Sequence, residues 1–301
     1  MIPEFYHFSK NRGKIDGFSI IIPSWNNLKY LSLCLQSIYK YSFYNHQIIV
    51  AINEGSDGTE KFCREKDLDY VYFKNNAGVC FAVNACRTIA ISDWLMYMND
   101  DMFVLPGWDL EIFNFLKKIN TKAVMVSATL IEPLDTKNPC VIVKNFGTTY
   151  EEFSENDVVN FAKENYRENW TGAAWPPVLV HKEIWDLVGG FSIEFSPGFY
   201  SDPDFSAKLY MAGVTEFIGL GNSLVYHFGT KSTKRVTRND GKNLFLLKWG
   251  LTASDFYRKI LNLGNTNFTK INLKPTFSIS QRLKYMIKSL AILLKIKIRI
   301  K

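Results

Sequence analysis

The chain has 301 residues, of which 47% are hydrophobic and 22% charged, and this composition excludes a disordered or fibrous protein. No stretch approaches the roughly 20 consecutive apolar residues that a membrane-spanning helix needs. The net charge of +7 is unevenly distributed, because residues 231–301 contain 17 Lys and Arg against two Asp and so carry +15, which leaves −8 for the remainder.

The first 130 residues alternate between two hydrophobic periodicities. Apolar residues recur at helical spacing after a capping Asn, at Leu28, Leu31, Leu35 and Ile38. Similar helical segments separate four continuous apolar runs that predict buried strands, at 18–22, 47–52, 69–73 and 94–98. Strands of this kind alternating with helices predict an α/β fold with a parallel sheet covered on both faces.

Small or polar residues follow each predicted strand. They are Pro23-Ser24-Trp25-Asn26, Asn53 to Gly58, Asn75 to Gly78, and Asn99-Asp100-Asp101. Because the carboxyl ends of parallel strands meet at one edge of a sheet, we expect these residues to line a ligand cleft. The adjacent carboxylates of Asp100 and Asp101 suit a hard divalent cation, an acid–base pair or the cap of the next turn.

The second half of the chain is less regular. A strand is expected at 122–130, and the polar segment 150–170 is expected to lack regular structure. Further along, the pattern predicts a helix near 181–188, a helix from about 203 to 211, and two short strands near 214–218 and 223–227.

Taken in order, these motifs resemble those of family 2 glycosyltransferases over about residues 17–230. The matching segments are Pro23 to Asn26, Glu54 to Gly58, Asn76-x-Gly78 with Asn84, Asn99 to Asp101, Gly189-Gly190-Phe191, Ser201 to Phe205, and Val225 to Phe228. The resemblance implies a GT-A fold, which is a Rossmann-like, mostly parallel sheet flanked by helices. It also implies a catalytic domain over 1–230, with a nucleotide-sugar half at about 17–130 and an acceptor half at about 131–230.

The resemblance further implies a role for each matching residue. Asp101 matches the metal-binding last position of a DxD-type motif, His227 matches a position that can supply a second ligand, and the implied cofactor is Mg²⁺ or Mn²⁺. Asp202 matches the general base. The residues expected to contact the nucleotide sugar are Pro23, Trp25, Asn26, Glu54, Asn76, Gly78, Asn84, Asn99 and Asp100.

Two of these positions depart from the family pattern. Asn99 replaces an Asp that lies close to the ribose, and Glu54 replaces an Asp that contacts the nucleobase, so the identity of the base stays open. The acceptor side is expected to involve Trp170, Thr171, Gly172, Trp175, Phe199, Tyr200 and Asp204.

The expected chemistry is a direct displacement. A divalent ion neutralises charge on the diphosphate leaving group, and Asp202 accepts the proton of the attacking acceptor hydroxyl. One base opposite one leaving group predicts inversion at the anomeric carbon. Three alternatives stay open: Asp202 as a helix cap before Pro203, His227 as a core imidazole, and the whole chain as a nucleotidyltransferase or a non-catalytic binder.

The basic extension, residues 231–301, ends in an amphipathic segment. Leu283, Met286, Ile287, Leu290 and Leu294 fall on one helical face, whereas the final LKIKIRIK alternates as a strand would. This pattern is typical of a helix on an anionic membrane surface, the alternative being a helix packed on the body. No nucleic-acid-binding signature accompanies the charge, so we expect a glycan or lipid-linked acceptor and no nucleic acid.

The cysteines indicate the compartment. Five cysteines, an odd number with no CxxC spacing and no preceding signal peptide, indicate reduced thiols. We therefore expect a cytoplasmic protein that associates with the inner face of the membrane.

Overall fold

The computed structural model describes residues 3–10, 15–165, 167–229, 235, 239–267, 271 and 277–300. The first half contains β1 (Phe5–Phe8), β2 (Ser19–Trp25), α1 (Leu28–Tyr41), β3 (Gln47–Asn53), α2 (Thr59–Glu65), β4 (Asp69–Phe73), α3 (Gly78–Cys86), β5 (Trp94–Tyr97), β6 (Met102–Val104) and α4 (Trp108–Leu116). The second half contains β7 (Val124–Glu132), β8 (Ile142–Val143), α5 (Glu155–Glu164), β9 (Trp170–Thr171), β10 (Val178–His181), α6 (Lys182–Val188), α7 (Ser201–Met211), β11 (Glu216–His227), α8 (Gly241–Trp249), α9 (Ala253–Asp255), a π-helical turn (Phe256–Ile260) and α10 (Ile279–Ile300).

These strands form one mixed, mostly parallel sheet, which confirms the predicted α/β architecture. The strand order is β1-β4-β3-β2-β5-β10-β7-β11-β6, with β8 beside β7 and β9 beside β11. The four strands predicted in the first half, β2 to β5, are parallel neighbours. Their carboxyl ends therefore share one edge, as expected.

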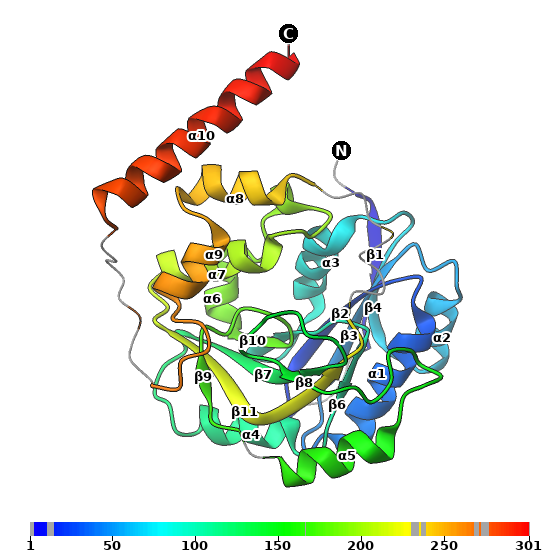
Figure 1. Ribbon diagram of the computed structural model, residues 1–301. Coiled ribbons are helices and arrows are strands. Elements are labelled where there is room, and N and C mark those ends of the chain that lie inside the picture. The colour runs from blue at the N-terminus through cyan, green and yellow to red at the C-terminus, as the bar shows by residue number, and fades with distance from the viewer. Residues whose placement is uncertain are drawn as a thin grey trace.

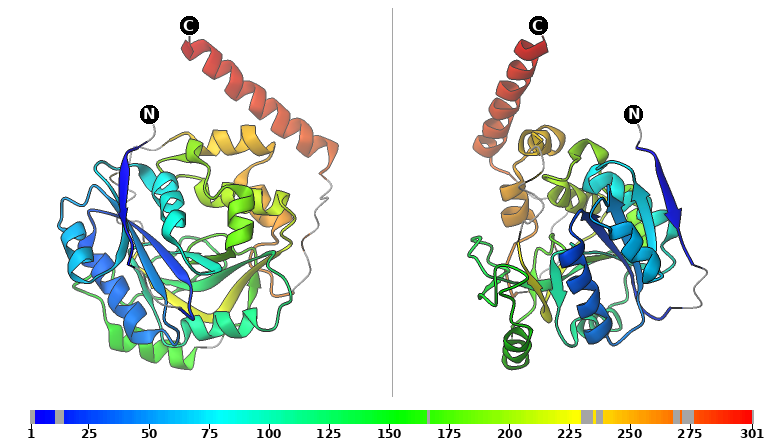
Figure 2. Two further views of the ribbon diagram at one scale, coloured as in Figure 1. Left: turned by 180° about the vertical axis from the view of Figure 1, so that it is seen from behind. Right: turned by 90° about the vertical axis from the view of Figure 1, so that its right-hand side faces the viewer.

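Helices cover both faces of the sheet (Figures 1 and 2). Helices α3, α6, α7 and α8 pack on one face in a core that includes Trp185, Phe191 and Phe205. On the other face α1, α2 and α4 enclose a second core with Trp108 at its centre. The sheet between them is buried on both sides, which accounts for its continuous apolar runs.

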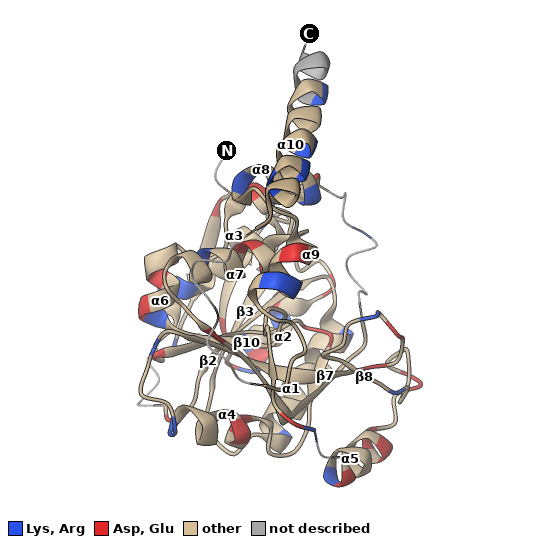
Figure 3. Ribbon diagram, turned by 60° about the vertical axis from the view of Figure 1, so that its left-hand side comes forward, with Lys and Arg blue, Asp and Glu red and all other residues tan. Residues whose placement is uncertain are grey.

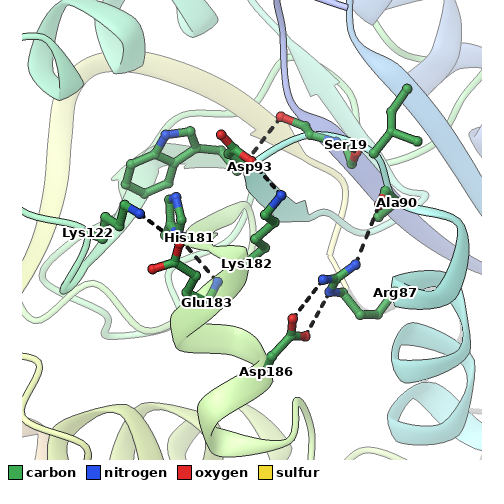
Figure 4. Close-up of polar contacts among 12 residues, drawn as sticks. Ser19, Arg87, Ala90, Asp93, Lys122, His181, Lys182, Glu183 and Asp186 are labelled. Carbon is green, nitrogen blue, oxygen red and sulfur yellow. Dashed lines mark hydrogen bonds and ion pairs between the residues drawn. The ribbon is translucent and has the colours of Figure 1, made fainter.

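The sheet edge opposite the predicted cleft is closed by ion pairs (Figure 4). Lys182 at the start of α6 pairs with Asp93 before β5 at 2.6 Å, and the next residue, Glu183, pairs with Lys122 before β7 at 2.7 Å. Arg87 and Asp186 join α3 to α6 through two hydrogen bonds of 2.8 and 2.7 Å. Polar groups at this edge are satisfied within the protein.

Three expectations for the second half were wrong. Segment 150–170 contains the helix α5, whose start is stabilised by a hydrogen bond from Ser154 Oγ to Asp157 and whose Val158 is buried. The two strands expected between 214 and 227 form one strand, β11, because a register shift between Leu220 and Leu224 absorbs the polar interruption.

The third wrong expectation concerns LKIKIRIK. It continues α10 to Ile300, since a helix that has already formed propagates more easily than a lone strand can form.

The hydrophobic core does not stop at residue 230. Phe245, Phe256 and Leu261 are buried in the same cluster as Phe205 of α7. Helix α10 projects from the body beyond α8 (Figure 1) and is anchored near its start, where Tyr285 Oη donates to Asp255 at 2.8 Å. The segment 239–267 is therefore part of the folded body.

Candidate active site

Three strand ends place His227 between two carboxylates. β6 and β11 pair antiparallel with His227 opposite Met102, so His227 lies beside Asp101, whose carbonyl accepts from the Phe228 amide at 3.1 Å. β7 runs parallel to β11 and ends at Glu132. As a result, His227 Nε2 lies 3.3 Å from Asp101 Oδ1, and Nδ1 lies 2.8 Å from Glu132 Oε1.

The electrostatics of this cluster follow from its burial. Burial disfavours the imidazolium, but the carboxylates of Asp101 and Glu132 outweigh burial and raise the pKa of His227 to about 10. The stabilisation from this proton is therefore fully present below the ordinary histidine pKa and is lost as the pH rises through about 10. Burial and the neighbouring Asp101 carboxylate raise the pKa of Asp100 to about 7.

A hollow of about 290 Å³, here called the central hollow, brings the predicted catalytic residues together. Its lining includes Asn99, Asp100, Asp101, Tyr200, Asp202 and His227. Asp101 and Asp202 come from opposite halves of the chain and open into the same space. Burial raises the pKa of Asp202 to about 7, and no described residue donates a hydrogen bond to its carboxylate.

A smaller hollow of about 60 Å³, the side hollow, adjoins the central one. It contains further predicted residues, namely Pro23, Trp25, Asn76, Gly78 and Asp100. At its rim, Trp25 Nε1 donates to Glu54 Oε2 at 2.8 Å, and the guanidinium of Arg235 lies 4.6 Å from the centre of the Trp25 ring. The hydrogen bonds from Trp25 and Asn26 lower the pKa of Glu54, so this carboxylate is ionised at neutral pH.

Unsatisfied groups and backbone strain gather around the two hollows. Among the described residues, Asn26 Oδ1 is buried without a hydrogen-bond partner. Ser24 Oγ and Asn27 Nδ2 are also buried and form no hydrogen bond of normal geometry, although both side chains lie close enough to Asp100 to favour its ionised form. Asn26, Glu54 and Tyr200 have φ values of 46°, 69° and 68°, in the left-handed region that non-glycine residues rarely adopt. Buried polar atoms without partners and local strain are typical of ligand sites.

Five predicted site residues lie elsewhere. The Asn84 side chain is held by Phe191, with its Nδ2 donating to the Phe191 carbonyl at 2.7 Å and its Oδ1 accepting from the Phe191 amide at 2.8 Å. Asp204 is fully buried and pairs with Lys248 at 2.8 Å and with Trp249 Nε1 at 2.9 Å. These two residues join helices together rather than face a hollow.

The other three form part of the packing around β9. Trp170 Nε1 donates to Thr129 at 2.8 Å, Thr171 Oγ1 donates to the Asn262 carbonyl at 2.6 Å, and Gly172 packs closely against Leu263. They attach β9 to the C-terminal segment. Of the predicted acceptor residues, Trp175, Phe199 and Tyr200 line a hollow.

The sequence reasoning missed residues that complete the site. Glu132 belongs to no motif, and its only signal is a charge at the end of a nine-residue apolar strand. A third hollow of about 730 Å³, the C-terminal hollow, shares Phe199, Tyr200 and Asp202 with the central one. Its wall contains Trp175, which the sequence predicted for the acceptor side, and Tyr257 and Arg258, which it did not.

Asp101 and His227 fit a divalent cation that is shared with a substrate. Among the described residues, no group of three or more His, Cys, Asp or Glu side chains is arranged to hold a metal. Mg²⁺ and Mn²⁺ sites that also use substrate phosphates need only one or two protein ligands. Two neighbouring ligand atoms, with Glu132 orienting the imidazole from behind, match that requirement.

Comparison with known proteins agrees with this geometry. Residues 19–163 match the family model described as "Glycosyl transferase family 2". Over these residues, just under half of the chain, the protein is similar to family 2 glycosyltransferases. The match contains β2 to β7 and thus the ends of the strands that carry Asn99, Asp100 and Asp101.

Relatives extend the similarity along the chain. Chondroitin synthase of Escherichia coli is 22% identical over 289 residues, which cover 86% of this chain and 42% of that protein. The chain thus spans less than half the length of this curated relative.

Two solved structures share the fold of this chain. S. aureus TarS 1-349 in complex with UDP-GlcNAc gives a TM-score of 0.56 at 13% identity, covering 91% of this chain and 71% of that one. GalNAc-T7 with UDP, GalNAc and Mn²⁺ gives 0.56 at 11% identity, covering 91% and 55%. At this level of identity the similarity shows the fold, and it confirms the predicted fold class.

The pKa of His227 can be measured directly. In the metal-free protein we expect the His227 ring to stay protonated through neutral pH and to titrate near 10, by NMR of the imidazole resonances. Glu132→Gln removes one of the two carboxylates and should lower this pKa, because part of the compensation for burial is lost. His181, whose pKa is lowered by burial, is the internal control and should not respond. A His227 that titrates near 6.5 would contradict the arrangement.

Proposed function

We propose that this protein is a metal-dependent, inverting glycosyltransferase that transfers a sugar from a nucleoside diphosphate sugar to a hydroxyl of a glycan or lipid-linked glycan. The observation that supports this proposal is the central hollow, where Asp101 and His227 on one side share a space with Asp202 on the other. The family match favours sugar transfer over the nucleotidyltransferase alternative. The relatives that contain UDP-GlcNAc, or UDP with Mn²⁺, support the proposed donor class.

Asp202 is the proposed general base. Its carboxylate has no hydrogen-bond donor among the described residues, and its pKa near 7 makes it a stronger base than an exposed aspartate. At neutral pH a large fraction is ionised and able to accept the proton of the acceptor hydroxyl. The carboxylates of Asp101 and Glu132 are instead engaged by His227.

The metal-binding residues are proposed to be Asp101 and His227. A bound divalent cation supplies positive charge for the diphosphate leaving group. For His227 to act as a ligand, Nε2 must lose its proton, while Nδ1–H remains hydrogen-bonded to Glu132. Glu132 therefore fixes the tautomer that leaves Nε2 available.

The proposed stereochemical result is inversion. Asp202 is the one carboxylate that we assign to proton transfer. The acceptor oxygen attacks the anomeric carbon as the bond between that carbon and the diphosphate breaks. The proton passes to Asp202, and the nucleoside diphosphate leaves. No covalent glycosyl intermediate is needed in this scheme.

The proposed location is an anionic membrane surface, contacted through α10. No helix in the described part of the chain is long and apolar enough to cross a membrane. α10 instead exposes Ile279, Leu283, Met286, Ile287, Leu290, Leu293 and Leu294, each 49–86% accessible. Figure 3 shows Lys and Arg along the same helix, whose sequence contains no Asp or Glu. Exposed apolar residues beside basic ones suit an anionic lipid surface, where a lipid-linked acceptor would be concentrated.

The base assignment predicts both a mutant phenotype and a pH profile. Asp202→Asn should abolish transfer while leaving nucleotide affinity unchanged, because it removes the proton acceptor and leaves the shape of the hollow. In the wild type, kcat/KM should rise with pH and level off above about 7, since the base must be ionised. The transfer rate of the variant and the pH profile of the wild type are measured with a radiolabelled nucleotide sugar between pH 5 and 9, about two pH units on either side of the Asp202 pKa. Wild-type transfer by Asp202→Asn would refute the role.

The membrane proposal is tested by vesicle flotation. The full chain should float with phosphatidylcholine vesicles that contain phosphatidylglycerol and remain behind with phosphatidylcholine alone. Replacing Leu283, Met286 and Leu290 together by Gln should reduce flotation at least about tenfold, since each exposed apolar side chain contributes on burial. Leu187→Gln, at an equally exposed apolar position on the body, is the matched control. Unchanged flotation of the triple variant would contradict the proposal.

A further inference from the structure

The C-terminal hollow begins where the central hollow ends. The two spaces share Phe199, Tyr200 and Asp202, so a molecule in the C-terminal hollow can reach the carboxylate proposed as the base. The far wall comes from residues 253–263, outside the family match at 19–163 and outside the region of motif resemblance. The C-terminal hollow has a volume of about 730 Å³, which is large enough for a sugar and the sugars bonded to it.

One part of this wall is a pair of aromatic rings. Trp175 and Tyr257 lie with ring centroids 4.7 Å apart at an interplanar angle of 36°. Tyr257 belongs to the π-helical turn Phe256–Ile260, a local geometry that is rare and often found at functional sites. Because Phe256 is buried in the core below it, the turn is held rigidly.

The Tyr257 side chain lines the hollow. Its hydroxyl is buried and has no hydrogen-bond partner among the described residues. A buried hydroxyl without a partner is costly, and a bound hydroxylated molecule would satisfy it. Burial, aided by the nearby carboxylate of Asp202, keeps the pKa of Tyr257 well above its ordinary value, so Tyr257 is a hydrogen-bond donor at any working pH.

Next to this tyrosine, Arg258 brings a positive charge to the lining of the hollow. Lys137, on the opposite rim, pairs with Asp135, and Lys259 pairs with Asp255 at 2.6 Å. Arg258 lines the hollow and, among the described residues, has neither an acid nor a carbonyl as partner. A guanidinium binds a carboxylate or a phosphate through two parallel hydrogen bonds.

From these features we propose that the C-terminal hollow is the acceptor subsite, with an acceptor sugar contacting the rings of Trp175 and Tyr257 and an anionic substituent of the acceptor bound by Arg258. This inference rests on the proposed function and deepens it, because it assigns the substrate class of the acceptor as an anionic glycan. Tyr257 and Arg258 are then residues for acceptor specificity, distinct from the base.

The test uses three probes that differ at one carbon of a single sugar. They are p-nitrophenyl glucoside, the corresponding glucuronide and the corresponding 6-phosphate, and each is titrated into the full chain with Mn²⁺ and UDP and followed by ligand-observed NMR. We expect at least one anionic probe to bind about fivefold or more tightly than the glucoside, and which one binds tighter distinguishes carboxylate from phosphate. Comparable affinities for all three, or no measurable binding, would overturn the proposal.

Variants separate the contribution of the Arg258 charge from that of the Tyr257 ring. Arg258→Gln should abolish the preference for the anionic probe with little effect on the glucoside, whereas Tyr257→Ala should weaken all probes by about tenfold. Tyr257→Phe isolates the hydroxyl and should have an intermediate effect. Lys137→Gln is the matched control, since its charge is already paired and its removal should leave the preference intact. A preference that survives Arg258→Gln, or that disappears in Lys137→Gln, would refute the assignment.

The readouts separate this inference from the function on which it rests. UDP binding, followed by thermal shift with Mn²⁺, and hydrolysis of UDP-GlcNAc by water need no acceptor. Variants at Tyr257 and Arg258 should keep both at wild-type levels while the apparent KM for a transferred acceptor rises. A wild-type chain that binds no nucleotide would refute the proposed function, whereas intact nucleotide binding with no probe preference would refute the subsite alone.

Discussion

The burial of one imidazole between two carboxylates is the constraint on which the active site depends. Asp101 and Glu132, with Asp100 close by, lie at the end of a sheet that is otherwise apolar, where unpaired charges would be costly. The His227 proton compensates for that cost, and it can do so because the start of β6 and the ends of β7 and β11 meet at one place. The same cluster is therefore stable without a cation and ready to exchange a proton for one. The proposed metal site and a folding requirement share the same residues.

In the proposed function, this arrangement divides the site into a donor side and an acceptor side. The donor side is built by the ends of β2 to β5, whose loops carry strained residues and unsatisfied polar atoms. The acceptor side is built later in the chain, by the start of α7 and by the π-helical turn after α9. Asp202, at the start of α7, lies at the junction of the two sides and lines both the central hollow and the C-terminal hollow. In the proposed reaction the proton is transferred at that junction.

Much of the donor side could be predicted from the sequence because strand patterns are local and parallel strands converge by geometry. Asn99 and Asp101 follow an apolar run, and this alone placed them at the sheet edge. Glu132 could not be predicted, since its role depends on the register between β7 and β11. Trp175 and Tyr257 are 82 positions apart and meet through tertiary packing that no local pattern encodes. Asn84 and Asp204 belong to the motifs, yet their side chains hold helices together.

The most direct test of the central claim is anomalous diffraction from crystals grown with Mn²⁺ and UDP. We predict one strong manganese peak within bonding distance of Asp101 and of His227 Nε2, with the diphosphate on the same ion and Asp202 facing it across the central hollow. A manganese ion bound elsewhere, or a diphosphate bound while His227 stays paired with Asp101, would contradict the claim.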